Sequence, residues 1–204
     1  MKLQILLVLV LASFAACAGP ATRSVVPIGT ARASADFAAY DLRRVGVLPP
    51  RGEWLEPELA DALRDALAAA FAVETSYEIV PLGPIELESI QRLDPVRTGR
   101  IPPAAILEVA RRAGLDAVLA PRVVDLRPYE PVRLGLEVDL IAVETGLVTW
   151  SAQVRVDTGD SRTLDAIEAW QMATRAGGES ERAVDILSPR RLAEFAAAQV
   201  AMLL

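Results

Sequence analysis

Two carboxylates, Glu137 and Asp139, stand two residues apart in a segment where apolar and polar residues alternate. In a strand, this spacing places both side chains on one face, about 7 Å apart. Carboxylate pairs at such distances can hydrolyse glycosidic bonds by acid and base catalysis. Arg133 and Arg155 can lie on the same polar face, however, and a solvated charge ladder then accounts for all four residues. We favour the ladder, and a carboxylate-dependent cell-wall hydrolase stays as the less favoured alternative.

A second possible catalytic carboxylate is Asp157, in the triplet Asp157-Thr158-Gly159. The same triplet occurs in aspartic proteases, whose chemistry needs two carboxylates that share one proton. The chain has no second triplet, so only a homodimer could supply the other carboxylate. Asp, Thr and Gly also favour turns at the ends of strands. A polar turn is therefore the interpretation that we prefer.

The chain contains no histidine and a single cysteine, Cys17. The missing histidines remove the commonest general base and the commonest transition-metal ligand. The formal net charge of −6 argues against a nucleic-acid partner, because phosphate binding needs a basic face. We therefore expect a non-catalytic protein that needs no cofactor or metal.

Cys17 follows a segment typical of a secretory signal. Lys2 precedes an apolar run over residues 3–14, which is too short to span a membrane, and the small pair Ala15-Ala16 comes directly before the cysteine. This arrangement resembles the cleavage box of bacterial lipoproteins, and the alternative is an ordinary cleaved signal. The resemblance implies lipidation of Cys17, and several acyl chains anchor a protein stably. Ala18, where Asp could stand, implies the outer membrane with the domain facing the periplasm.

Composition and pattern divide the chain into four parts. We expect a lipoprotein signal peptide over 1–16, a lipidated tether over 17–42, an α/β domain over 43–157, and a C-terminal helical extension over 158–204 packed on the domain. The tether is rich in Ala, Ser, Pro and Thr, and residues 36–40 can form one helical turn within it.

Hydrophobic periodicity predicts an α/β fold: a mixed parallel and antiparallel sheet of about five strands, packing helices, and further C-terminal helices. The strands are expected at 44–48, 77–82, 116–126, 132–143 and 147–156, and the helices at 57–72, 85–93, 102–113, 162–176 and 189–203. In the first helix, the buried stripe recurs every four residues at Leu59, Leu63, Leu67 and Phe71. The last two strands alternate around a turn at Gly146, which is typical of a hairpin.

Five short sequence segments, taken in their order along the chain, resemble segments of a superfamily of envelope proteins. They are Val45-Gly46-Val47-Leu48-Pro49, Tyr77-Glu78-Ile79-Val80-Pro81, Ala113-Gly114-Leu115-Asp116-Ala117-Val118-Leu119, Leu136-Glu137-Val138-Asp139-Leu140 and Thr145-Gly146-Leu147-Val148-Thr149-Trp150-Ser151. The superfamily includes the curli-secretion lipoprotein CsgG, the penicillin-binding-protein activator LpoB and the amino-terminal domain of TolB. The resemblance covers about residues 44–156 and implies a TolB-like or CsgG-like sandwich that works through protein contacts.

The chain departs from the curli type, whose pore needs long membrane-spanning hairpins of about 9–11 residues per strand. The link at 127–130 is too short for one, and residues 83–101 are interrupted by prolines and charges. We therefore expect a membrane-anchored adaptor, activator or assembly component that binds another envelope protein or itself. An oligomeric secretion component is the alternative.

Four residues of the C-terminal extension are candidates for partner contact. Arg190 and Arg191 stand in the first turn of a helix, where cations are unfavourable, and could face an acidic partner or lipid headgroups. Trp170 and Phe195 could anchor a partner, since aromatic side chains dominate interfaces. Solvated charge for the arginines, and packing against the domain for the aromatic pair, are the alternatives that we prefer.

Overall fold

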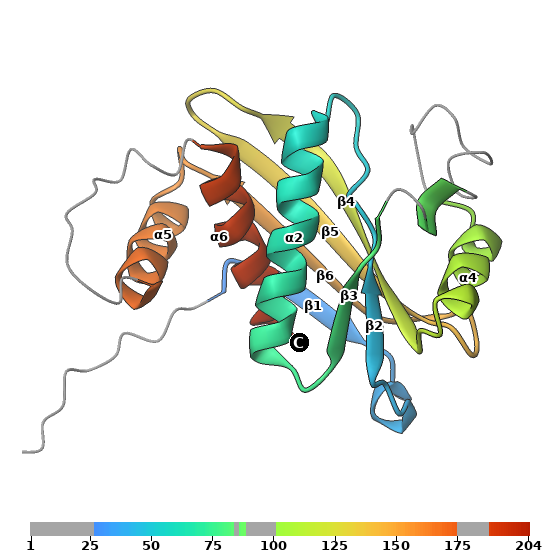
Figure 1. Ribbon diagram of the computed structural model, residues 1–204. Coiled ribbons are helices and arrows are strands. Elements are labelled where there is room, and N and C mark those ends of the chain that lie inside the picture. Colours follow the sequence, from blue (N-terminus) through green and yellow to red (C-terminus); the bar gives the residue numbers. More distant parts are fainter. Residues whose placement is uncertain (1–26, 84–85, 89–100, 175–187) are drawn as a thin grey trace, which may run out of the picture.

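Six strands form one mixed sheet in the computed structural model, which describes residues 27–83, 86–88, 101–174 and 188–204 (Figure 1). The strand order is β1-β6-β5-β4-β2-β3. β2 runs parallel to β3 and β4, and all other neighbours are antiparallel. The strands are β1 (Gly29–Ala33), β2 (Arg44–Val47), β3 (Glu78–Pro81), β4 (Ala117–Arg127), β5 (Arg133–Ala142) and β6 (Val148–Asp157). The expected α/β class is confirmed.

The described helices follow the predicted order. They are the 3-10 helix η2 (Phe37–Ala39) and the α-helices α2 (Pro57–Glu74), α4 (Pro103–Arg112), α5 (Ser161–Thr174) and α6 (Pro189–Ala201). Residues 86–88 are helical, and the rest of the helix expected at 85–93 lies outside the described residues. The described helices include none that is long and apolar enough to cross a membrane.

Local signals in the sequence explain where the helices begin and end. Pro189 occupies the first turn of α6, and the Ser188 hydroxyl accepts a hydrogen bond from the Arg191 amide. α4 ends at Arg112 and is followed two residues later by Gly114, whose φ of +63° is a left-handed conformation that glycine adopts without strain. The next residue, Leu115, donates its amide to the Ala110 carbonyl at 2.9 Å, which closes the helix end.

The covered face of the sheet, as we call the face beneath α2 and α6, holds the larger hydrophobic core. The stripe Leu59, Leu63, Leu67 and Phe71 of α2 is buried there, as the sequence predicts. Phe71 meets Trp150 of β6 edge to face, with 6.1 Å between ring centroids. α6 adds Phe195 and Val200 to the same core and lies beside α2 (Figure 1). The C-terminal helix α6 thus packs on the covered face.

β1 is the element that the sequence did not predict. It lies at Gly29–Ala33, inside the stretch expected to be tether, and pairs antiparallel with β6. Only Ala31 of this strand packs against the core, so β1 lacks the alternating large apolar residues that reveal a strand. The sheet therefore has six strands where about five were expected, and η2 forms the expected helical turn.

Candidate functional site

The opposite side of the sheet, the open face, is covered among the described residues only where β4 begins. There α4 and Leu87 pack on Val118 and Ile141, forming a second, smaller core. Beyond that end, most residues of β4, β5 and β6 on this side are polar and exposed or half-buried, and the apolar Val124 is 44% exposed. The polar residues are Arg122, Arg133, Glu137, Asp139, Ser151, Gln153, Arg155 and Asp157. A sheet face with this composition is stable in water and free to meet another molecule.

The candidate carboxylates form ion pairs across neighbouring strands. Arg122 of β4 lies opposite Glu137 of β5 and its guanidinium contacts that carboxylate. Arg133 of β5 lies opposite Asp157 of β6, with 3.1 Å between Nε and Oδ2. The polar face therefore carries ion pairs between strands, and the partner of Glu137 is Arg122, which the sequence analysis did not name. Each of these two carboxylates forms an ion pair with an arginine of the neighbouring strand, an interaction that stabilises a sheet.

The Asp157-Thr158-Gly159 triplet closes the end of β6. The Asp157 Oδ1 atom accepts the Gly159 amide at 3.0 Å, and the Thr158 hydroxyl accepts the Val132 amide at 2.8 Å. The Thr158 amide in turn donates to the Val132 carbonyl. All three residues thus serve a turn, which agrees with the preferred interpretation.

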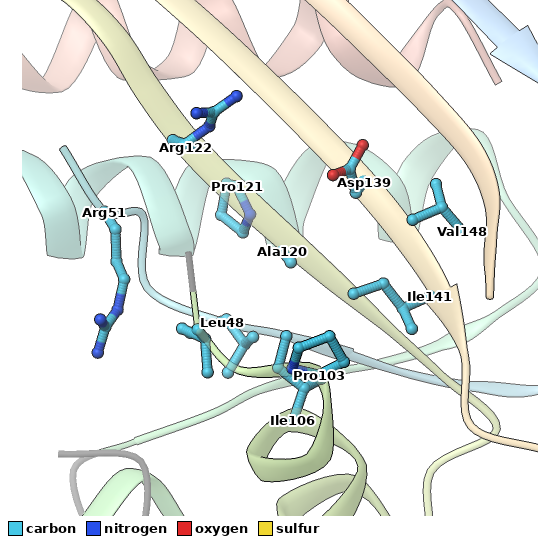
Figure 2. A pocket seen from close by; sticks show the side chains of 11 residues that line it. Leu48, Arg51, Pro103, Ile106, Ala120, Pro121, Arg122, Asp139, Ile141 and Val148 are labelled. Atoms are coloured by element: carbon cyan, nitrogen blue, oxygen red, sulfur yellow. The ribbon is translucent and has the colours of Figure 1, made fainter. Parts of the chain in front are cut away.

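A pocket of about 310 Å³ opens where α4 meets the open face (Figure 2). Its floor is apolar, and Arg51, Arg122 and Asp139 bring charged groups to it from three different segments. In Figure 2, Arg51 lies on one side of the apolar floor, while Arg122 and Asp139 lie toward the sheet. The apolar lining comes from Leu48, Ile101, Pro103, Ile106, Ala120, Pro121, Ile141 and Val148. An apolar pocket with a few polar groups at its rim is the usual form of a binding site.

Among the residues that line the pocket, Asp139 alone was named from the sequence as a candidate functional residue. The lining is drawn from the segments after β2, before and within α4, and on β4, β5 and β6. No spacing within any one segment signals the pocket, because it forms only when the sheet order brings the segments together. The sequence feature that comes closest to indicating the pocket is the segment 45–49, after which the chain leaves β2 and runs along β4.

The chain after β2 is held against β4 by backbone hydrogen bonds. The Arg51 amide donates to the Pro121 carbonyl at 3.3 Å, and the Val123 amide donates to the Arg51 carbonyl at 2.7 Å. A Cβ on Gly52 would lie 2.7 Å from the Val123 carbonyl oxygen, so this close approach requires glycine. These contacts place Arg51 at the pocket.

The other predicted site residues lie away from the pocket. Trp170 and Phe195 are buried, 8% and 0% exposed, and meet edge to face at 5.5 Å between centroids. They pack α5 against α6, which is the preferred alternative to partner contact. Arg190 and Arg191 are on the surface at the start of α6, and both pair with Glu194 at 3.0 and 3.1 Å. Cys17 lies outside the described residues.

Among the described residues, no cluster of metal ligands is found, and two shifted pKa values belong to residues outside the pocket. Within the described ranges, no group of three or more Asp, Glu, Cys or His side chains is placed to hold a metal ion. The Arg43 guanidinium lowers the pKa of Asp41, and burial raises the pKa of Tyr77. Neither residue lines the pocket.

No protein-family model matches the chain, and the search of curated proteins found no match. Among solved structures, the chain is similar to the PelC dodecamer from Paraburkholderia phytofirmans, with a TM-score of 0.46, 18% identity, and coverage of 68% of this chain and 89% of that one. It is also similar to the lipoprotein GNA1162 from Neisseria meningitidis, with a TM-score of 0.43, 18% identity, and coverage of 66% and 99%. For the LpoB C-terminal domain from Salmonella enterica, the TM-score is 0.40 at 17% identity, with coverage of 56% and 83%.

Proposed function

We propose that the protein is a lipid-anchored envelope adaptor that binds a partner protein on its open face and catalyses no reaction itself. The observation that carries this proposal is the pocket on the open face, bordered by ion pairs rather than by a catalytic pair of carboxylates. The anchor is Cys17, and by resemblance the membrane is the outer membrane, with the domain in the periplasm.

The pocket fits one or a few apolar side chains of a partner. Its floor combines Leu48 and Ile106 with Ile141 and Val148, so burying an aliphatic or aromatic anchor there removes apolar surface from water. Val148 is itself 48% exposed and would be covered by such a partner. The charged rim supplies polar groups that fix the orientation of the bound segment.

The ion pairs favour this function over hydrolysis. A glycosidase needs one carboxyl that donates a proton and another carboxylate that acts as base or nucleophile. Glu137 and Asp157 each face an arginine on the neighbouring strand instead. Paired charges of opposite sign across β4, β5 and β6 are typical of a polar surface that binds another protein.

Photo-crosslinking in intact cells tests the proposal. A photoreactive residue at Val148 should give a reproducible crosslinked product, since this position borders the pocket. The matched control is the same residue at Ala69, which is exposed on α2, over the covered face. A product at both positions, or at neither, would contradict the assignment of the open face. A product whose mass is a multiple of this chain would identify the partner as a second copy.

The anchor is tested separately. The Cys17→Ala variant should keep the folded domain but lose its association with membranes, because the acyl chains have no attachment point. Membrane retention equal to that of the wild type would disprove lipid anchoring while leaving the open-face assignment standing.

A further inference from the structure

The protein carries an unusually exposed tryptophan, Trp54, in the loop between β2 and α2. Its side chain is 84% exposed, whereas Trp150 and Trp170 are 2% and 8% exposed. The backbone of Trp54 has a φ of +62°, a conformation that side-chain-bearing residues seldom adopt. Trp54 belongs to neither hydrophobic core of the described residues, so a surface outside the protein is where its indole can be buried.

A second exposed aromatic residue lies on the adjacent loop. Tyr129, between β4 and β5, is 68% exposed, and the Arg127 guanidinium lies 5.8 Å from its ring centroid. β2 and β4 are parallel neighbours, so the loops that follow them leave the sheet at the same end. Figure 1 shows both loops together at the top of the view.

The start of β1 belongs to this same end of the sheet. Gly29 pairs with Val154, three residues before the end of β6, and the end of β6 pairs through β5 with the end of β4. The chain therefore enters the domain at the end that carries Trp54 and Tyr129. The turn between β5 and β6, with Leu147, lies at the opposite end.

The position of β1 limits how far this end can be from the anchor. Ten residues lie between Cys17 and Ile28, and even a fully extended chain over these eleven Cα-to-Cα steps spans at most about 40 Å. Gly29 lies opposite Val154, so the end of β6 at Asp157 is three residues, about 10 Å, from this entry point, whereas its start at Val148 is six residues, about 20 Å, away. The aromatic end is thus the one that the tether holds nearer to the lipid.

We propose that this end of the sheet rests on the membrane that holds Cys17, with Trp54 and Tyr129 in the headgroup layer. The inference rests on the lipid anchor of the proposed function and adds an orientation to it. Trp and Tyr favour the membrane interface because their rings are apolar and their N–H or O–H groups stay hydrated. In this orientation, the open face and its pocket stand beside the membrane surface, available to a partner in the periplasm.

The charges around Trp54 predict which lipids it prefers. Glu53, Glu56 and Glu58 are exposed on the same short segment, and Glu130 is exposed beside Tyr129. Anionic headgroups attract basic residues and repel carboxylates. The indole should therefore enter a zwitterionic surface more readily than an anionic one.

Intrinsic fluorescence of the full-length, lipidated protein in vesicles tests the orientation. Because the other two tryptophans are buried, Trp54 dominates the fluorescence that iodide can quench. In phosphatidylcholine vesicles, Trp54 should be protected from iodide and quenched by lipids brominated on their acyl chains. Vesicles rich in phosphatidylglycerol should give weaker protection, and the Glu53→Gln/Glu56→Gln variant should remove much of this difference.

The matched control moves the reporter to the other end of the sheet. In the Trp54→Phe/Leu147→Trp variant, the new indole replaces a leucine that is 61% exposed, and it should stay open to iodide and insensitive to brominated lipid. Equal lipid quenching of both reporters would overturn the proposal, as would full iodide access of Trp54 on vesicles that carry the protein.

Flotation of the same vesicles separates this proposal from the anchor. Wild-type protein that fails to float overturns lipid anchoring and, with it, this orientation. Protein that floats while Trp54 stays open to iodide overturns only the orientation. In that case, photo-crosslinking from position 54 to a protein would assign the aromatic end to a protein partner instead.

Discussion

The covered face and the open face are built from alternate residues of the same strands, yet they differ in burial, in polarity and in the interactions that hold their side chains. On β5, Leu134, Leu136 and Val138 are fully buried beneath α2 and α6. Their neighbours Arg133, Glu137 and Asp139 point the other way and are half-buried. One set of side chains is fixed by packing, and the other by cross-strand pairing and water.

The difference suggests a division of labour. Apolar burial contributes most of the stability of a domain, whereas partly exposed ion pairs contribute little. A surface that contributes little to stability can carry binding residues without a large energetic cost. If this division holds, substitutions on the covered face should change the free energy of unfolding, and substitutions on the open face should change partner contact.

Phe195→Ala should give the largest loss of stability. The ring is fully buried and contacts Trp170, so its removal should lower the free energy of unfolding by about 3–5 kcal/mol. Urea denaturation followed by circular dichroism measures the change. Val148→Ala on the open face is the control and should stay within about 0.5 kcal/mol of wild type. Similar losses for both variants would refute the division.

Alternation and helical periodicity made the covered face predictable from sequence. The buried set on β5 and the stripe on α2 were both expected, because each follows the period of its own element. The cap at Gly114 and the Ser188 N-cap were readable for a similar reason, since each depends on neighbours in the chain.

The open face was predicted as polar, but its pairs and its pocket were not. Arg122 meets Glu137 because of the register between β4 and β5, which shifts at a bulge between Val123 and Asp125. The pocket depends on the loop after β2 lying along β4, a contact between distant segments. Sequence patterns describe one element at a time, so they carry no information on such contacts. Trp170 illustrates the same limit, because its helix pattern does not say which element it packs against.

Gln199→Ala should give the second largest loss of stability. This buried amide of α6 accepts the Ile28 backbone N–H at 3.0 Å and so ties the entry to β1 to the covered face. Its loss leaves a part-buried donor without that partner and should cost about 1–3 kcal/mol. In this variant, the rate of hydrogen exchange should increase more at the β1 amides than at the β5 amides. The control is Gln153→Ala, an exposed change on β6, and equal effects from both would contradict this role.

Glu137→Gln should separate stability from binding on the open face. The Arg122–Glu137 pair is partly exposed, so its loss should change the unfolding free energy by at most about 1 kcal/mol. Crosslinking from Val148 should fall more clearly, because Arg122 borders the pocket and loses its fixed orientation. Glu194→Gln is the control: it removes the surface ion pairs with Arg190 and Arg191 on α6 and should leave crosslinking unchanged. A large loss of stability with intact crosslinking would reverse the proposed roles.

Tyr77 gives the smallest predicted effect, visible only at alkaline pH. Burial raises the pKa of its phenol, which packs partly against the core of the covered face. The folded state therefore favours the neutral phenol, and its contribution to stability is complete below the pKa of the unfolded chain, about 10. As pH rises through the higher pKa of the folded state, that contribution is lost.

Unfolding free energies on either side of about pH 10 measure this loss. Tyr77→Phe should flatten the alkaline decline, because the side chain then cannot ionise. Tyr129→Phe at the exposed end of the sheet should leave the decline in place, since Tyr77 is still present. A decline that survives Tyr77→Phe but disappears in Tyr129→Phe would show that the exposed end, and not the covered face, controls alkaline stability.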